Sequence, residues 1–146
     1  CGQQGCLDTV ASRLAIASQA TQAAYRGAAP YLFDAVGTDL RQIRSGVLSK
    51  SVANGDQAVE DIIRSACGYL GQAIASMVSL FAPDMIILGG GLVEAMPELM
   101  VAATQSAARA RSISILRDSF EVRAAMLGDD ASVLGAAIWA ANEANK

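Results

Sequence analysis

Residues 81–91 read Phe81-Ala82-Pro83-Asp84-Met85-Ile86-Ile87-Leu88-Gly89-Gly90-Gly91, and the rest of the chain is arranged around them. Pro83 ends the preceding apolar helix, because proline lacks a backbone N–H and its ring clashes with the turn before it. The unbroken apolar run from Met85 to Leu88 predicts a short strand covered on both faces, as in a parallel sheet flanked by helices. We therefore expect an α/β fold.

The three glycines after this strand, Gly89, Gly90 and Gly91, carry no Cβ atoms. Backbone N–H groups in such a turn can approach a phosphate or a ribose without steric obstruction. A strand that runs into glycines and then a helix is also common where the glycines only close a tight turn. From these residues alone, ligand binding and structural closure both remain open.

The composition bounds the class of protein. The chain has 146 residues, 53% of them apolar, which suits one domain with a sizeable core. No apolar run is long enough to span a bilayer and no signal peptide opens the chain, so we expect a cytoplasmic protein without membrane contact. The net charge of −3 and the scattered Lys and Arg argue against a nucleic-acid surface, so DNA contact would need an upstream DNA-binding domain. The absence of histidine excludes a histidine base or a Ser-His-Asp triad built from this chain alone.

The first eight residues form a cysteine-containing segment, Cys1-Gly2-Gln3-Gln4-Gly5-Cys6-Leu7-Asp8. Two thiolates at this spacing, with glycines between them, could share one tetrahedral zinc ion, but zinc needs four ligands and only two are here. Three cysteines are an odd count for a disulfide framework. By spacing alone, metal binding and free or oxidised thiols both remain open.

Apolar periodicity and capping signals predict the helices. The expected helical segments are residues 9–25, one or two short helices within 39–53, the long core helix 57–81, then 97–111 and 131–144. Asp56 is expected to be the N-cap of the long helix, and residues 31–37 an irregular segment. Inside that helix Gly68 and Gly71 are expected to permit close helix packing, and Cys67 to be inert core.

Residues 120–125 alternate weakly after a turn-like segment and predict a second strand. Two strands do not make a stable α/β sheet, and the first half of the chain supplies helices without obvious strands. We therefore expect this chain to be part of a larger protein.

Three separated segments resemble the ROK family, named for repressors, open reading frames and sugar kinases. Residues 1–8 look like the second half of the family's zinc signature, C-x-C-G-x-x-G-C-x-E. Residues 83–91 are similar to its P-x-x-I-V-L-G-G-G stretch, and residues 128–137 resemble its closing A-x-x-x-G-A-A segment. Their order and spacing agree along essentially the whole chain.

The resemblance implies an α/β fold of the actin-like, RNase H-type ATPase class, with residues 1–146 as its helix-rich C-terminal lobe with a small sheet. The last helix, about residues 131–144, is then expected to pack on an N-terminal lobe. The family's catalytic aspartate, its D-x-G-x-T phosphate loop and its E-x-G-H sugar motif all lie upstream of Cys1. No catalytic residue is therefore expected within this chain.

The resemblance also implies roles for individual residues. Cys1 and Cys6 match two of the family's three structural zinc cysteines, the missing ligands being a cysteine and a histidine. Asp8 matches the glutamate that reaches the sugar and is one methylene shorter, which leaves the sugar's identity open. Gly89 to Gly91 match the nucleotide-side turn, which favours contact with ATP.

The function implied is that of an ATP-dependent hexose kinase, glucokinase-like, in which the upstream aspartate deprotonates a sugar hydroxyl that attacks the γ-phosphate of Mg-ATP. The implied cofactors are ATP, Mg²⁺ and a structural Zn²⁺, and a homo-oligomer is expected. The alternative is the sugar-sensing lobe of a ROK transcriptional repressor. The intact glycine turn favours the kinase, whereas Asp8 in place of glutamate mildly favours the sensor. The chain alone is expected to lack kinase activity and to self-associate.

Overall fold

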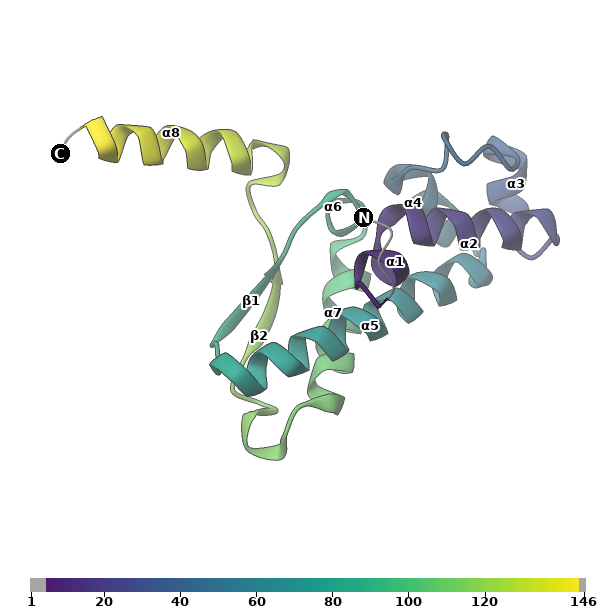
Figure 1. Ribbon diagram of the computed structural model, residues 1–146. Helices are drawn as coiled ribbons and strands as arrows, with labels where there is room; N and C mark the ends of the chain where they lie inside the picture. The colour runs from purple at the N-terminus through teal and green to yellow at the C-terminus, as the bar shows by residue number, and fades with distance from the viewer. Residues whose placement is uncertain (1–4, 145–146) are drawn as a thin grey trace.

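The computed structural model describes residues 5–144, which form a helix-rich α/β arrangement (Figure 1). In chain order, the elements are α1 Asp8–Ala11, α2 Arg13–Tyr25, α3 Pro30–Val36, α4 Ser45–Ala53, α5 Gln57–Phe81, β1 Met85–Leu88, α6 Gly91–Ala95, α7 Pro97–Arg111, η1 Ser114–Leu116, β2 Glu121–Ala124, η2 Gly128–Asp130 and α8 Ala131–Ala144. The predicted strands and the helices at 57–81, 97–111 and 131–144 are confirmed.

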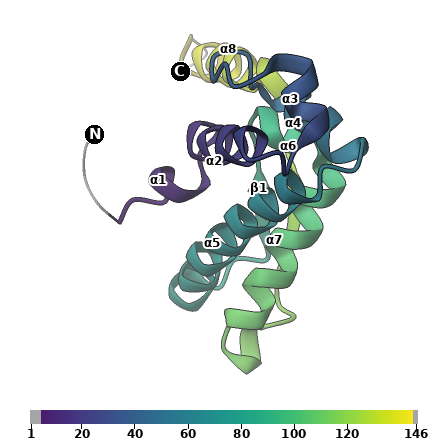
Figure 2. The ribbon, with the colours of Figure 1, turned by 90° about the vertical axis from the view of Figure 1, so that its right-hand side faces the viewer.

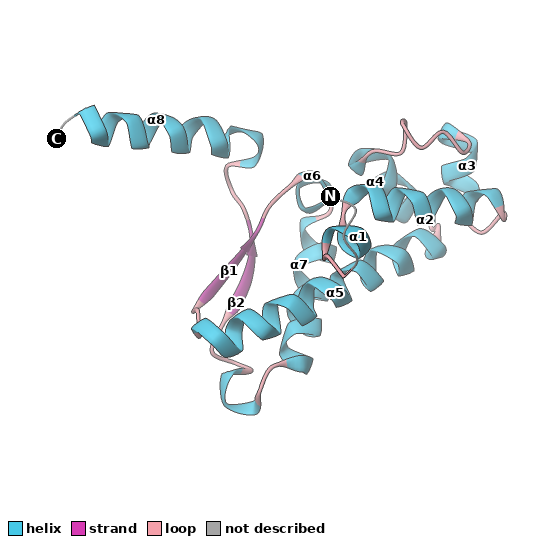
Figure 3. Cartoon of the chain, viewed as in Figure 1, coloured by secondary structure: helices cyan, strands magenta, loops and turns pink. Residues whose placement is uncertain are grey.

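The described sheet has two parallel strands, β1 and β2, drawn in magenta in Figure 3. Met85 pairs with Glu121 and Leu88 with Ala124. Helices α6 and α7 lie in the connection between the strands, as a parallel pairing requires a long crossover.

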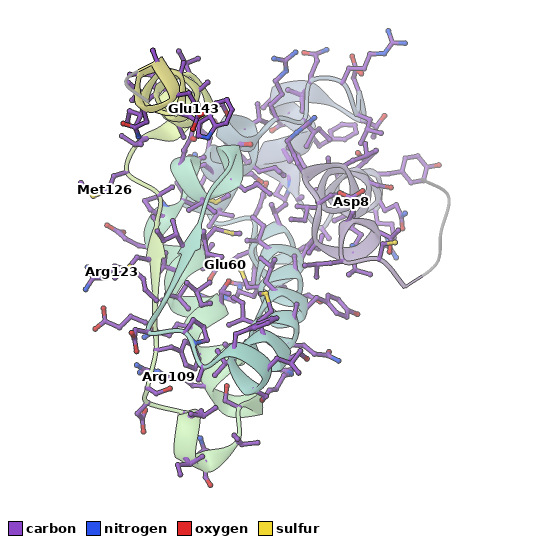
Figure 4. The ribbon with its side chains drawn as sticks, turned by 60° about the vertical axis from the view of Figure 1, so that its left-hand side comes forward. Asp8, Glu60, Arg109, Arg123, Met126 and Glu143 are labelled. Carbon is purple, nitrogen blue, oxygen red and sulfur yellow. The ribbon has the colours of Figure 1, made fainter. Side chains whose placement is uncertain are left out.

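One face of this sheet packs on the helices and the other is open. Ile86 packs against a core cluster formed by Ile74, Val78, Ala108, Phe120 and Val122. On the opposite face Ile87 is 66% exposed, and Figure 4 shows Arg123 and Met126 pointing away from the helices. The prediction that β1 is covered on both faces is therefore wrong for the described residues, because no described element packs on this second face.

Helices α5 and α7 pack directly against each other. A Cβ atom added at Gly71 would lie 2.5 Å from Cβ of Ala107 and 2.7 Å from the backbone nitrogen of Ala108. Gly71 therefore permits the close packing that was predicted, whereas Gly68 does not contribute, because a Cβ atom there would meet nothing within 4 Å. Cys67 is fully buried, and this burial raises the pKa of its thiol, which confirms its place in the core.

A second, larger core lies between α2, α3, α4, the first half of α5, α6 and the start of α7. The buried carboxylate of Asp56 holds part of it together. It accepts hydrogen bonds from the backbone N–H groups of Tyr31 (3.2 Å) and Leu32 (2.8 Å) and from the hydroxyl of Ser51 (2.6 Å).

The predictions for the Asp56 side chain and for residues 31–37 are corrected by the structure. Asp56 occupies the N-cap position of α5, but its side chain makes no cap there and binds the first turn of α3 instead. The segment expected to be irregular is the helix α3, which Pro30 begins at the position where its missing N–H is harmless.

The single helix expected over residues 9–25 is interrupted. Ser12 has extended backbone angles, and its hydroxyl accepts a hydrogen bond from the backbone nitrogen of Ala15 (3.2 Å). It therefore ends α1 and caps α2. Within residues 39–53 the structure forms one α-helix, α4.

Helix α8 stands apart from α5 and α7, as the two perpendicular views in Figures 1 and 2 show. None of its described residues is buried, and Trp139 is 69% exposed. Across residues 5–144, no helix has both the length and the apolar character needed to cross a membrane.

Candidate functional site

The glycine turn after β1 combines structural and ligand-facing features. Gly90 has a φ of 106° and a ψ of 161°, a conformation that L-residues other than glycine rarely adopt. A Cβ atom at Gly91 would lie 3.1 Å from the hydroxyl of Ser45, so α4 approaches the turn closely. Gly89 has neither a positive φ nor a close neighbour, because a Cβ atom added there would lie at an ordinary 3.7 Å from the Cβ atom of Ala125. Structural closure thus accounts for Gly90 and Gly91, and leaves Gly89 unexplained.

All three glycines line a cavity of about 340 Å³. Ala11 and Arg13 from the α1–α2 junction and Ser45 from α4 also line it. The rest of the lining is apolar and consists of Leu70, Leu88, Leu92, Val93 and Met100. Small-molecule sites have volumes of about 300–1,000 Å³ and mostly apolar linings, so this cavity has the size and character of a ligand site.

Asp8 is the first residue of α1, after Leu7 at the N-cap position. Its side chain is exposed, and within residues 5–144 its carboxylate has no hydrogen bond or ion pair (Figure 4). The other end of this single-turn helix, Ala11, lines the glycine-turn cavity. The structure thus brings the predicted sugar residue and the predicted nucleotide turn to the two ends of α1.

Cys6 is half-buried with a free thiol, and its carbonyl oxygen accepts hydrogen bonds from the backbone nitrogen and the hydroxyl of Thr9. It lines a separate cavity of about 450 Å³ against Tyr69 and Gln72 of α5. Cys1, its predicted zinc partner, lies outside the described residues. Among the side chains that the structure describes, which leave out Asp129, no three of Cys, Asp or Glu come close enough together to hold a metal ion. Neither a zinc nor a magnesium site is therefore formed by these residues.

Sequence reasoning missed Arg13 and Ser45, which line the same cavity as the glycines. It also missed Arg41 and Arg44, which line a neighbouring cavity of about 500 Å³ with them. No spacing in the sequence marks these residues, because the tertiary fold brings the starts of α2 and α4 to the turn. Only the three-dimensional arrangement reveals them.

The fold as a whole matches that of a solved sugar kinase. The structure of a ROK family glucokinase from Streptomyces griseus, in complex with glucose and AMPPNP, superposes with a TM-score of 0.83 and 30% identity. The match covers 95% of this chain and 45% of that chain. The chain therefore has the actin-like ATPase fold, with the helix-rich lobe and small parallel sheet expected.

The ROK family model matches residues 1–143, and the chain belongs to this family. It is 33% identical over 140 residues to the glucokinase of Halalkalibacterium halodurans, covering 92% of this chain and 40% of that protein. It is 27% identical over 136 residues to the DNA-binding transcriptional dual regulator NagC of Escherichia coli K12, covering 93% of this chain and 32% of that protein. The chain thus spans less than half the length of these relatives.

Proposed function

We propose that this chain belongs to an ATP-dependent hexose kinase, glucokinase-like, and supplies its nucleotide-side turn. The observation that carries this proposal is the cavity onto which Gly89, Gly90 and Gly91 open. The similarity to glucokinases, one of them in complex with glucose and AMPPNP, supports it. The enzyme transfers the γ-phosphate of ATP to a sugar hydroxyl.

The residues of this chain bind and orient the substrates. The glycine turn fits a nucleotide, because its Cβ-free backbone lets a ribose or phosphate approach closely. The free carboxylate of Asp8 accepts a hydrogen bond from a sugar hydroxyl. Catalysis in this class is mostly positioning and charge neutralisation, and the base that deprotonates the sugar lies outside this chain.

The described residues alone do not supply enough ligands for the zinc and magnesium ions that the family resemblance implies. Cys6 is the one described member of the proposed zinc pair, and Cys1 with two ligands from outside these residues would complete the set. Mg²⁺ neutralises phosphate charge when bound with ATP, and no described carboxylate cluster holds it.

The chain is further proposed to be the C-terminal lobe of a cytoplasmic homo-oligomer. The exposed apolar residues of α8 support packing on an N-terminal lobe, because Val133, Leu134, Ile138 and Trp139 have no cover within the described residues.

A second candidate is the sugar-sensing lobe of a transcriptional repressor. The similarity to NagC supports it, as does Asp8 at the position where the family pattern has glutamate. In this case the lobe binds a sugar without transferring phosphate, and a DNA-binding domain outside this chain reads the operator.

A coupled ATP-consumption assay on the full-length protein, with a panel of hexoses and N-acetylated hexosamines, tests the proposal. We expect turnover with at least one sugar, and a loss of about 10- to 100-fold in kcat/KM for Asp8→Asn, because a sugar hydroxyl loses a charged acceptor. Asp8→Glu should change the sugar preference, whereas Asp34→Glu, an exposed residue of α3, should not. A sugar that raises the melting temperature without ATP turnover would support the sensor instead.

A further inference from the structure

The cavity at the glycine turn has a second cavity beside it. Arg13 and Ser45 line both the 340 Å³ cavity at the turn and the 500 Å³ cavity formed with Leu14, Leu40, Arg41 and Arg44. Because the two cavities share these two residues, we treat them as the two halves of one groove, from the glycine turn to the starts of α2 and α4. We call its second half the arginine groove, defined by Arg13, Arg41 and Arg44.

The charge of the arginine groove differs from that of the chain. The whole chain has a net charge of −3, yet three guanidinium groups line this groove, and no Asp or Glu whose side chain the structure describes lines either cavity. Within residues 5–144, none of the three guanidinium groups has a hydrogen bond or an ion pair. Three exposed, unpaired arginines on one concave surface favour an anion.

The nearest acidic residue along the chain does not neutralise them. The carboxylate of Asp39 accepts hydrogen bonds from the side-chain nitrogen of Gln42 (2.9 Å) and the backbone nitrogen of Arg41 (3.0 Å). These hydrogen bonds, that of Gln42 first, lower the pKa of Asp39, which is therefore ionised at neutral pH. Even with this carboxylate counted, the three arginines leave the described residues of the groove with an excess of positive charge.

The two halves of the groove suit two parts of one ligand. The half at the glycine turn has a mostly apolar wall, which suits a base and a ribose. The half with the arginines suits phosphates, because a planar guanidinium group donates two parallel hydrogen bonds to phosphate oxygens. Arg44 is also the N-cap residue of α4 and gives it no side-chain cap, so the first backbone N–H groups of this helix add to the positive potential.

We propose that Arg13, Arg41 and Arg44 add contacts to the phosphate groups of the nucleotide whose nucleoside lies at the glycine turn, beside the upstream phosphate loop that the family resemblance implies. This inference rests on the proposed function, since it requires a nucleotide at that turn. The arginines hold the polyphosphate by charge and orient it, and none of them takes part in proton transfer.

Equilibrium binding of adenosine, ADP and ATP to the full-length protein tests this assignment. Because each lost contact between an arginine and a phosphate weakens only phosphorylated ligands, Arg41→Gln/Arg44→Gln should reduce ATP affinity by about tenfold or more. ADP should lose less, and adenosine should be unaffected. The dependence of ATP affinity on salt should also fall. Arg117→Gln is the matched control, because Arg117 is exposed after η1, away from the groove.

The other possible results distinguish failure of the arginine groove from failure of the proposed function. Unchanged ATP affinity in the double variant, in a protein that phosphorylates a sugar, overturns the arginine groove and leaves the kinase intact. Equal losses for adenosine and ATP overturn it as well, since the arginines then act on the nucleoside or the fold. If the wild-type protein binds no nucleotide, the proposed function fails. If the wild-type protein then binds tripolyphosphate and the double variant does not, the groove is retained as an anion site. If the wild-type protein does not bind tripolyphosphate either, both the groove and the proposed function are overturned.

Discussion

At the scale of single residues, Asp56 joins three segments that are distant along the chain. Its buried carboxylate accepts hydrogen bonds from the first turn of α3 and from Ser51 of α4, while its backbone begins α5. The negative charge also lies at the N-terminus of α3, where it stabilises the helix dipole. This one side chain therefore fixes how α3 and α4 meet the long helix.

Replacing Asp56 should destabilise the protein strongly. Asp56→Ala leaves the two backbone donors of α3 and the Ser51 hydroxyl without their acceptor, which should lower the free energy of unfolding by about 2–4 kcal/mol. Urea denaturation of the full-length protein measures this change. Asp34→Ala on the exposed side of α3 is the control, and we expect it to stay within about 0.5 kcal/mol of the wild type. Equal losses for the two variants would contradict the role given to Asp56.

The residues of the site were partly predictable from sequence. The Gly-Gly-Gly turn was identifiable because glycines directly after an apolar strand have a specific stereochemical use, and Gly90 indeed has the positive φ that requires glycine. Arg13 and Ser45 were not identifiable, because an arginine or serine at a helix start is ordinary and their place at the cavity depends on tertiary packing. The roles of Asp8, Cys1 and Cys6 stay predictions.

At the scale of elements, the contact of α5 with α7 is set by one glycine. Gly71 faces the backbone of α7 at Ala107 and Ala108, whereas Gly68, three residues earlier on α5, faces open space. The two glycines lie in the same helix and differ in what surrounds them, so they form a matched pair for mutation.

Gly71→Ala and Gly68→Ala should change stability in opposite directions. An alanine at residue 71 forces α5 and α7 apart and should cost about 1–3 kcal/mol, since the blocking atoms include rigid backbone. An alanine at residue 68 meets nothing and should stabilise the helix by about 0.5–1 kcal/mol. Thermal unfolding of the full-length protein checks both. A neutral Gly71→Ala would show that the helices are packed less closely than described.

The long elements were predictable and the short ones were not. Helices α5, α7 and α8 follow the helical period over many residues, so pattern alone finds them. Helix α3 was missed because it is short and its start depends on Asp56, a residue distant in sequence. The break at Ser12 was missed because a serine cap inside an alanine-rich run is a weak signal. The open face of β1 was unforeseen, because an apolar strand does not reveal which neighbours are present.

At the scale of the whole molecule, α8 and β1 leave apolar surface open. Helix α8 exposes Leu134, Ile138 and Trp139, and β1 exposes Met85 and Ile87. Surfaces of this kind are uncommon on monomeric proteins and mark regions that pack on another body. They are consistent with a chain that spans less than half the length of its relatives.

A polypeptide of residues 1–146 alone should therefore self-associate and show no kinase activity. Exposed apolar side chains on α8 drive the association, so Leu134→Ser/Ile138→Ser should shift the population toward monomer. Ile115→Ser, which removes an exposed isoleucine from η1, should not. Sedimentation velocity measures the distribution. A monodisperse wild-type monomer, or ATP-dependent sugar phosphorylation by this polypeptide, would contradict the account.

The most direct test of the glycine turn as a nucleotide site is calorimetric titration of the full-length protein with AMPPNP. The proposed function predicts saturable binding of one AMPPNP per chain, since one glycine turn opens onto one cavity. A folded protein that binds a sugar but no AMPPNP would contradict the central claim and would leave Gly89, Gly90 and Gly91 with a structural role alone.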